Sequence, residues 1–161
     1  MFRKAVMITA ALTLGSAFVG IAGVPSGADS GSHCTFQHVP NLEPGVSHSP
    51  SSGKFIDPGG GTIDCSGAVN GRGSYTDSGT VEGTCQDGGT AEGDPTFTIA
   101  GQTFTDHVKI KFVPRPSENG LVHATFEGAR TQGTIELMPT KGDCVFNPVT
   151  QIRGTGEFTL K

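Results

Sequence analysis

Two histidines and a glutamate are the residues whose types and spacing best suit acid–base chemistry. His107 and His123 fall in successive runs of alternating polar and apolar residues, 107–112 and 121–127, and Glu127 ends the second run. A histidine beside a carboxylate is the minimal general base. All three occupy polar positions of their runs, so we expect them to face solvent as a surface polar pair. No G-x-S-x-G serine motif accompanies them, and the sequence assigns no catalytic residue.

The strongest metal-binding candidate is the segment 86–94, in which Asp87, Glu92 and Asp94 stand among glycines. Carboxylate oxygens suit calcium, and glycines let backbone carbonyls turn toward an ion. The spacing matches neither an EF-hand loop nor a glycine-rich β-helix repeat. A hairpin turn with solvated acidic side chains explains the segment more simply. We therefore predict no metal site, and no cofactor, because no phosphate-binding glycine loop occurs either.

Four cysteines, Cys34, Cys65, Cys85 and Cys144, are widely spaced along the chain. They include no C-x-x-C pair, so they do not form a zinc-binding pattern. An even number of cysteines in an exported chain indicates two disulfides. Of the possible pairings, we favour Cys65–Cys85 between neighbouring strands and Cys34–Cys144 between an amino-terminal arm and a late loop.

Residues 1–28 have the composition of a secretory signal peptide. Arg3 and Lys4 precede an uncharged, largely apolar run, and small residues close the segment. A membrane anchor is the alternative, because the apolar run approaches the roughly 20 residues needed to span a bilayer. Its glycines make it only mildly apolar, and no basic cluster follows it. We expect cleavage before Asp29, with Gly20–Ala22 as a second possible site, and a secreted, extracellular protein with no stable membrane anchor.

The charge of the chain argues against nucleic acid as a partner. The net charge is −4, and removal of a leader with two basic residues leaves 15 acidic against 9 basic side chains, near −6. An acidic surface repels a phosphate backbone. The chain also has no Trp and only one Tyr, which leaves few aromatic platforms for a carbohydrate.

Alternation of apolar and polar residues dominates the chain from Thr62 onward. The clearest runs are 107–112 and 121–127, and 134–137 and 157–160 continue the pattern. Strict alternation is typical of antiparallel strands with one buried face. Turn sequences separate the runs at intervals of roughly 10 to 15 residues. We predict an all-β fold, an antiparallel meander of about seven or eight strands, with a closed barrel favoured over a β-sandwich.

The segment 29–61 has a different composition from the rest. It contains four prolines and many Ser, Gly and His residues. Such a stretch has loop character, so we predict an irregular amino-terminal arm with at most a short strand near Cys34. The β domain proper is then expected at 62–161.

The two clearest runs also predict a strand register. Placing Ile110 opposite Ala124 puts the apolar side chains of both runs on one face. The same register places His107 opposite Glu127 on the polar face, an acceptable cross-strand pair.

Segments around the cysteines resemble those of small secreted, β-rich proteins common in actinobacteria. The run Gly133–Cys144 with Pro148–Thr150, and the segments Thr62–Gly67 and Gly83–Cys85, carry the resemblance. It covers most of the mature chain, and its marks are cysteines, glycines and strand alternation. The resemblance implies a secreted β-rich fold and assigns no catalytic residue.

These observations predict an exported, disulfide-braced β domain that acts as a non-enzymatic binding or interaction module. Its expected partner is a small apolar ligand or a protein. The alternative is a cofactor-free enzyme, a cyclase- or isomerase-like barrel acting on a small apolar substrate. The barrel interior distinguishes these possibilities. A deep cavity with buried titratable groups favours an enzyme, whereas a filled interior leaves only a surface role.

Overall fold

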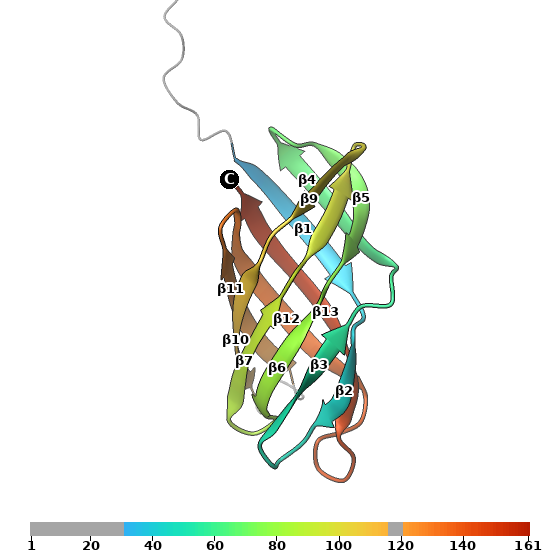
Figure 1. Cartoon of the computed structure of the whole chain (residues 1–161), viewed down its shortest axis with the longest axis vertical. Helices are drawn as coiled ribbons and strands as arrows, with labels where there is room; N and C mark the ends of the chain where they lie inside the picture. Colours follow the sequence, from blue (N-terminus) through green and yellow to red (C-terminus); the bar gives the residue numbers. More distant parts are fainter. Residues whose placement is uncertain (1–30, 116–120) are drawn as a thin grey trace, which may run out of the picture.

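The computed structural model describes residues 31–115 and 121–161, and the predicted signal peptide lies outside these ranges. In this part of the chain 13 strands form one sheet (Figure 1). No helix within these ranges is long and apolar enough to cross a membrane. The strands are β1 (Ser32–His38), β2 (Asn41–Val46), β3 (Ser51–Ile56), β4 (Gly61–Gly67), β5 (Gly71–Thr76), β6 (Ser78–Thr84), β7 (Gly88–Gly93), β8 (Thr96–Ile99), β9 (Gln102–Thr105), β10 (Val108–Arg115), β11 (Leu121–Gly128), β12 (Thr131–Lys141) and β13 (Val149–Leu160).

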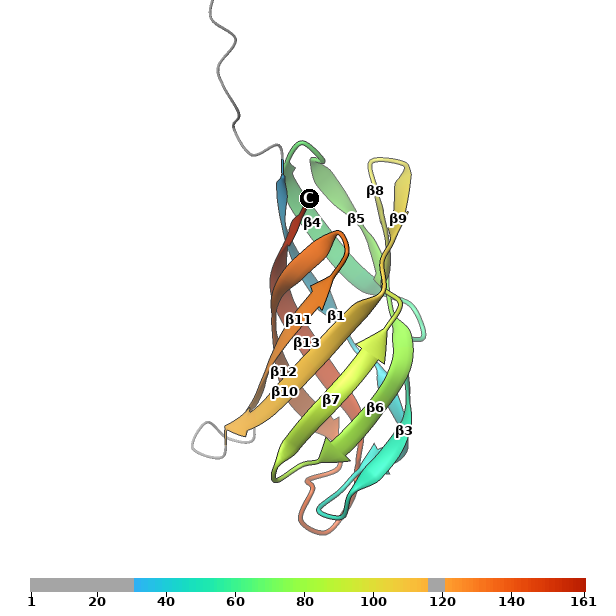
Figure 2. The ribbon, with the colours of Figure 1, turned by 60° about the vertical axis from the view of Figure 1, so that its left-hand side comes forward.

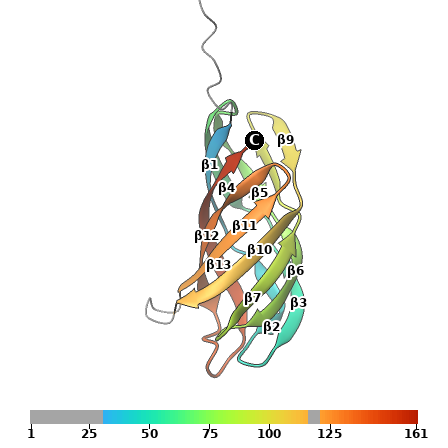
Figure 3. The ribbon, with the colours of Figure 1, turned by 90° about the vertical axis from the view of Figure 1, so that its left-hand side faces the viewer.

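Eight of these strands close into a barrel. Their order around the wall is β12–β11–β10–β7–β6–β3–β2–β13, and the pairing of β12 with β13 completes the ring. Neighbouring strands are antiparallel, and they run obliquely to the long axis, as barrel closure requires (Figures 2 and 3). The other five strands extend the wall toward the end that carries the C terminus (Figure 1). The predicted all-β antiparallel barrel is confirmed.

The extending strands are continuations of the ring strands, separated from them by short breaks. Breaks occur at Pro40, Asp57, Asp77, Asp94 and Asp106, which we call the central belt. Backbone hydrogen bonds join neighbouring breaks: Asp57 N–H donates to Asp77 O (2.8 Å), Asp94 N–H to Ser78 O (2.9 Å) and Asp106 N–H to Pro95 O (3.2 Å). The belt therefore divides the barrel into two halves at one level.

The segment predicted as an irregular arm, 29–61, differs from that expectation. It contains β1, β2 and β3, and two of these strands belong to the closed ring. Three of its four prolines lie outside the strands: Pro40 and Pro58 fall at breaks of the central belt, and Pro50 directly precedes β3. Pro44 lies within β2, beyond the residues that pair with β3. The β structure therefore begins at Ser32, and only the expected short strand near Cys34 was anticipated correctly.

The register of β10 and β11 is also shifted from the predicted one. Ile110 lies opposite Phe126, two residues from its predicted partner, and Glu127 lies opposite Lys109. His107 precedes β10, so it does not pair with Glu127. Alternation has a period of two, so it determines which face each side chain occupies. It does not distinguish strand registers that differ by two residues, because both keep every side chain on the same face.

The half of the barrel toward the C terminus, which we call the upper half, is filled by aromatic rings. Phe36 stacks on Tyr75 with ring centroids 4.7 Å apart, and Phe158 lies 5.5 Å from Phe97. A glycine makes room for this packing, since a Cβ atom at Gly156 would come within 2.8 Å of the Phe36 ring. A small cavity beside Tyr75, Phe97 and Phe158 has a volume of about 10 Å³, too little for a ligand.

Candidate functional site

The lumen on the other side of the central belt, the lower half, holds a cavity. Its volume is about 460 Å³, within the range of roughly 300–1,000 Å³ typical of small-molecule sites. The eight strands of the closed ring supply its wall, because their alternate side chains point inward. Apolar residues dominate the lining, among them Leu42, Phe55, Val81, Ala91, Ile110 and Val149.

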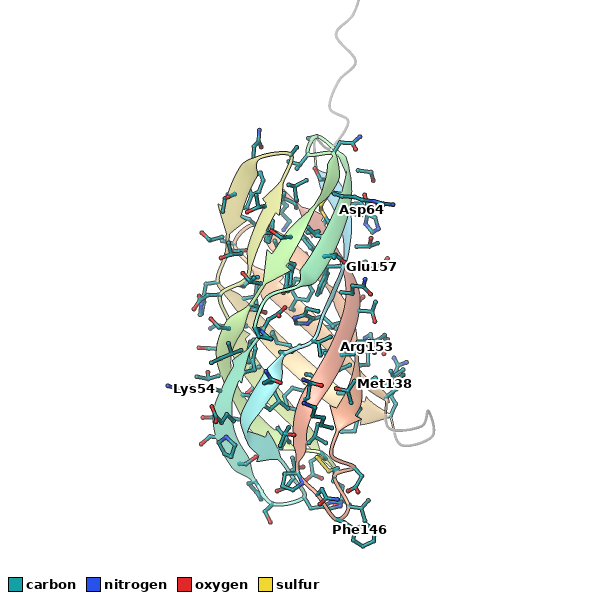
Figure 4. The ribbon with its side chains drawn as sticks, turned by 90° about the vertical axis from the view of Figure 1, so that its right-hand side faces the viewer. Lys54, Asp64, Met138, Phe146, Arg153 and Glu157 are labelled. Atoms are coloured by element: carbon teal, nitrogen blue, oxygen red, sulfur yellow. A yellow bond between two sulfur atoms is a disulfide. The ribbon has the colours of Figure 1, made fainter. Side chains whose placement is uncertain are left out.

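The cavity reaches solvent at the end of the barrel opposite the C terminus. Exposed residues border it there: His48 after β2, Gln86 between β6 and β7, and Asp143 between β12 and β13. The Cys85–Cys144 disulfide joins the second and third of these connections. Figure 4 shows this bond near the lower end of the barrel. The mouth is therefore braced covalently across the wall.

Asp143 shapes the connection that follows β12. Its Oδ1 accepts hydrogen bonds from the backbone N–H groups of Val145 (2.9 Å), Phe146 (2.8 Å) and Asn147 (2.9 Å). These bonds, with the strongest from Asn147 and Phe146, lower the pKa of Asp143 to about 2. The turn holds Phe146 in solvent, 88% exposed, at the tip beyond the mouth (Figure 4).

Two polar side chains, His38 and Asp77, lie at the inner end of the cavity. Each residue is only 5% exposed, and both line the cavity. His38 ends β1, and its ring meets Tyr75 edge-on with centroids 5.1 Å apart. Gly154 on β13 leaves space for the imidazole, because a Cβ there would overlap His38 Nε2. Both ring nitrogens of His38 and Oδ1 of Asp77 have no hydrogen-bond partner among the described residues.

Burial determines the charge of His38. It lowers the pKa of His38 to about 4, so the imidazole is neutral at pH 7. Asp57 Oδ2 lies 3.7 Å from His38 Nδ1, beyond hydrogen-bond distance. Burial also raises the pKa of Asp57, although a hydrogen bond from the Gly59 backbone opposes this shift. The two groups are neighbours without forming a tight ion pair.

Burial likewise raises the pKa of Asp77, to about 7. Hydrogen bonds from Tyr75 and from the Ser78 backbone oppose the shift, while the charges of Asp94 and Asp57 add to it. The Tyr75 hydroxyl donates to Asp77 Oδ2 at 3.2 Å. A carboxyl with a pKa near neutrality can donate, accept or exchange a proton. The inner end can therefore bind a polar group, and it can also supply acid–base chemistry.

The sequence-predicted polar residues lie elsewhere, on the outer wall. His107 Nδ1 lies 2.8 Å from Asp94 Oδ1, and His123 Nδ1 lies 2.7 Å from Glu136 Oε1. Glu127 contacts neither histidine and lies opposite Lys109 on the outer face. The structure thus keeps the three residues on the polar face but does not bring them together. Other charged side chains, including Lys54, Asp64, Arg153 and Glu157, also point outward (Figure 4).

The acidic segment 86–94 forms a turn followed by β7. Asp87 accepts a hydrogen bond from the Thr84 hydroxyl at 3.1 Å, and Asp94 pairs with His107 at the far end of the strand. Glu92 is exposed on the outer face of β7. In residues 31–115 and 121–161, no group of three or more His, Cys, Asp or Glu side chains could hold a metal ion.

The disulfide pairing favoured from the sequence is wrong. The bonds are Cys34–Cys65 and Cys85–Cys144, and no described cysteine is free. Cys34 lies directly opposite Cys65 in the pairing of β1 with β4, in the upper half. The favoured partner Cys85 lies at the mouth, because the chain crosses the central belt between Cys65 and Cys85. The error follows from treating the segment around Cys34 as an arm.

Sequence reasoning missed the polar residues of the inner end. One signal was available for His38, because it continues the buried alternation of Cys34 and Phe36 in β1. A histidine at a core position needs an explanation. Asp77 carried a weaker signal, as one of several aspartates that follow strand-like runs. Only the closed barrel brings His38 and Asp77 to the same level.

Comparison with known proteins identifies no relative. The chain matches no family model, no curated protein and no solved structure.

Proposed function

We propose that this protein is an exported, non-enzymatic carrier or receptor for a small, largely apolar molecule held in the lower half of the barrel. The observation that carries the proposal is the apolar cavity of about 460 Å³, open at one end and closed at the other. Burying apolar ligand surface there contributes roughly 25 cal/mol per Å². Two disulfides support an oxidising, extracellular location.

A protein partner is the less favoured occupant. Among the described residues, the two most exposed large apolar side chains, Val145 and Phe146, lie together at one loop tip, and the others (Val39, Ile56, Val113 and Met138) are scattered over other segments. A stable protein interface typically buries about 800 Å² on each partner, far more than two side chains supply. The cavity, by contrast, has a wall, an entrance and a closed end.

Fluorescence titration with N-phenyl-1-naphthylamine tests the proposal. The dye brightens in apolar surroundings, so we expect a saturable increase with one dye bound per chain. Ala91→Phe should strongly weaken binding, because Ala91 is buried in the cavity wall and the larger ring fills the space. Thr90→Phe is the matched control, since Thr90 directly precedes Ala91 in β7 and is exposed on the opposite face. Equal binding by both variants, or no binding by the wild type, would reject the lumen as the site.

One observation favours a cofactor-free enzyme as the second candidate. Asp77 faces the apolar cavity with a pKa of about 7 and is hydrogen-bonded to Tyr75, which suits proton transfer at a carbon acid. Such an enzyme would remove a proton from an apolar unsaturated ketone and return it at another carbon. The test is conversion of a β,γ-unsaturated cyclic ketone to its conjugated isomer, followed by ultraviolet absorbance. Loss of turnover in Asp77→Asn but not in Asp94→Asn would support the enzyme, and no turnover by wild type would remove this ketone class.

A further inference from the structure

The inner end of the cavity differs chemically from its wall. The wall is apolar, but His38 and Asp77 also line the cavity. Three of their atoms are buried without a hydrogen-bond partner in the described chain: His38 Nδ1, which lies 3.7 Å from Asp57 Oδ2, His38 Nε2, which lies beside Gly154, and Asp77 Oδ1. Leaving a buried donor or acceptor without a hydrogen-bond partner is unfavourable, because the group has lost its hydrogen bonds to water. A wholly apolar ligand pressed against this end would leave these atoms unmatched, whereas a ligand with one polar group would satisfy some of them.

We propose that the natural ligand is an amphipathic molecule with an uncharged hydroxyl head group, bound head first so that the hydroxyl hydrogen-bonds His38 and Asp77. This inference rests on the proposed binding function and specifies its ligand class. A hydroxyl both donates and accepts. It therefore complements a neutral imidazole, which offers one donor and one acceptor nitrogen, and a carboxyl oxygen.

The charge around the inner end argues against a charged head group. Asp57 and Asp77 are both buried near His38, so an anionic head would meet carboxyl groups in a site of low polarity. A cationic head would have to leave water as well, and burying an ion pair returns little net free energy even when the pair is well formed. A hydroxyl avoids both penalties.

The packing of the upper half limits how far the ligand can enter. The rings of Phe36 and Tyr75 lie directly behind His38, with centroids 5.6 Å and 5.1 Å from the imidazole. These rings belong to the core of the upper half, where the small cavity beside Tyr75 has a volume of only about 10 Å³. The head group must therefore stop at the central belt, and the apolar body must lie between the belt and the mouth.

A series of naphthalenes with one varied substituent tests the proposal. The compounds are 1-methylnaphthalene, 1-naphthalenemethanol, 1-naphthylmethylamine and 1-naphthoate, each titrated as a competitor of the bound dye at pH 7. We expect 1-naphthalenemethanol to bind about tenfold more tightly than 1-methylnaphthalene, the scale of one net hydrogen bond. A purely apolar cavity would instead prefer the methyl compound, because the hydroxyl is costly to remove from water.

Two variants connect this preference to the named residues. His38→Phe keeps an aromatic ring and removes both nitrogens, and Asp77→Leu removes the carboxyl at similar size. Each should lose the preference for the alcohol. Each should also retain affinity for 1-methylnaphthalene, which confirms that the cavity is intact. Asp94→Leu is the control, because Asp94 occupies the equivalent break between β7 and β8 but is exposed.

The outcomes separate the two proposals. If no compound binds, the proposed function fails together with the inference. If 1-methylnaphthalene binds at least as tightly as the alcohol, the cavity binds apolar molecules but the hydroxyl inference is wrong. Tightest binding by the amine or the carboxylate would also overturn it. An unchanged alcohol preference in both His38→Phe and Asp77→Leu would contradict the assignment of these residues.

Discussion

His38 and Asp77 shift the free energy of unfolding in opposite directions as the pH changes. Burial lowers the pKa of His38 from 6.5 to about 4, so its contribution to stability is present above pH 6.5 and is lost as the pH falls toward 4. Burial raises the pKa of Asp77 from 3.8 to about 7, so its contribution is present below pH 3.8 and is lost as the pH rises toward 7. Both residues lie at the cavity's inner end. As the pH rises through this window, the contribution of His38 to the free energy of unfolding increases while that of Asp77 decreases.

Asp77→Asn should abolish the decrease in the free energy of unfolding that ionisation of Asp77 causes as the pH rises. Asparagine does not ionise, so the variant should gain about 2–3 kcal/mol relative to wild type between pH 5 and pH 8. The neighbouring groups that titrate, Tyr75, Asp57, Asp94 and His38, remain in both proteins. Urea unfolding of the pair at the two pH values measures the difference. A constant difference would show that Asp77 ionises normally in the folded protein.

At the scale of elements, Asp106 joins the break between β9 and β10 to the turn between β11 and β12. Its carboxylate accepts hydrogen bonds from the N–H groups of Ala129 (3.2 Å), Arg130 (3.0 Å) and Thr131 (3.0 Å), and from the Thr131 hydroxyl (2.8 Å). Burial alone would raise the pKa of Asp106, but the hydrogen bonds from Thr131, Arg130 and His107 outweigh it and lower the pKa.

Asp106→Ala should therefore destabilise the barrel by roughly 2 kcal/mol, the scale of losing several hydrogen bonds to a partly exposed carboxylate. Asp94→Ala should cost much less, because the Asp94 side chain is exposed and contacts His107 on the surface. Thermal or urea unfolding of both variants makes the comparison. Equal destabilisation would mean that the contacts of Asp106 with the β11–β12 turn add nothing.

The Cys34–Cys65 bond links β1 to β4 and closes a loop with a sequence separation of 31. Replacing both residues with alanine should lower the free energy of unfolding by about 2–5 kcal/mol. A reductant should lower the free energy of unfolding of the wild type by more than this double substitution does, because it also opens the Cys85–Cys144 bond. Peptide mapping without reduction should recover Cys34 joined to Cys65. Recovery of Cys65 joined to Cys85 would contradict this strand arrangement.

The sequence predicted the architecture better than the site, for physical reasons. Alternation with a period of two identified the strands after Thr62, their buried faces and the antiparallel barrel. It missed β2 because Pro44 and Gly45 interrupt the alternation between the buried Leu42 and Val46. It missed β3 because Ser51 and Gly53 precede Phe55, its one buried apolar residue. It missed His38 and Asp77 because their proximity depends on where the strand breaks align around the ring. That alignment is a property of the closed barrel rather than of any one segment.

At the scale of the whole molecule, the barrel combines a filled half with a hollow half. The filled half holds the Cys34–Cys65 bond and the stacked aromatic rings, while the hollow half opens at a mouth braced by Cys85–Cys144. The filled half stabilises the fold through its packing. The cavity lowers the stability of the other half, because side chains that line a cavity lose packing contacts. A ligand in the lower half would restore those contacts and stabilise the fold in proportion to its affinity and concentration.

Methyl NMR spectroscopy with 1-naphthalenemethanol can locate a ligand in the barrel, because a bound aromatic ring changes the chemical shifts of nearby methyl groups. A ligand in the lower half should change the chemical shifts of methyl groups that line the cavity, those of Leu42, Val81, Ile110 and Val149. Methyl groups of the filled half, Ile63 and Ile99, and of the exposed Val113 and Val145 should stay in place. Changes confined to the exposed valines, or no changes at saturating ligand, would contradict a binding site in the lumen.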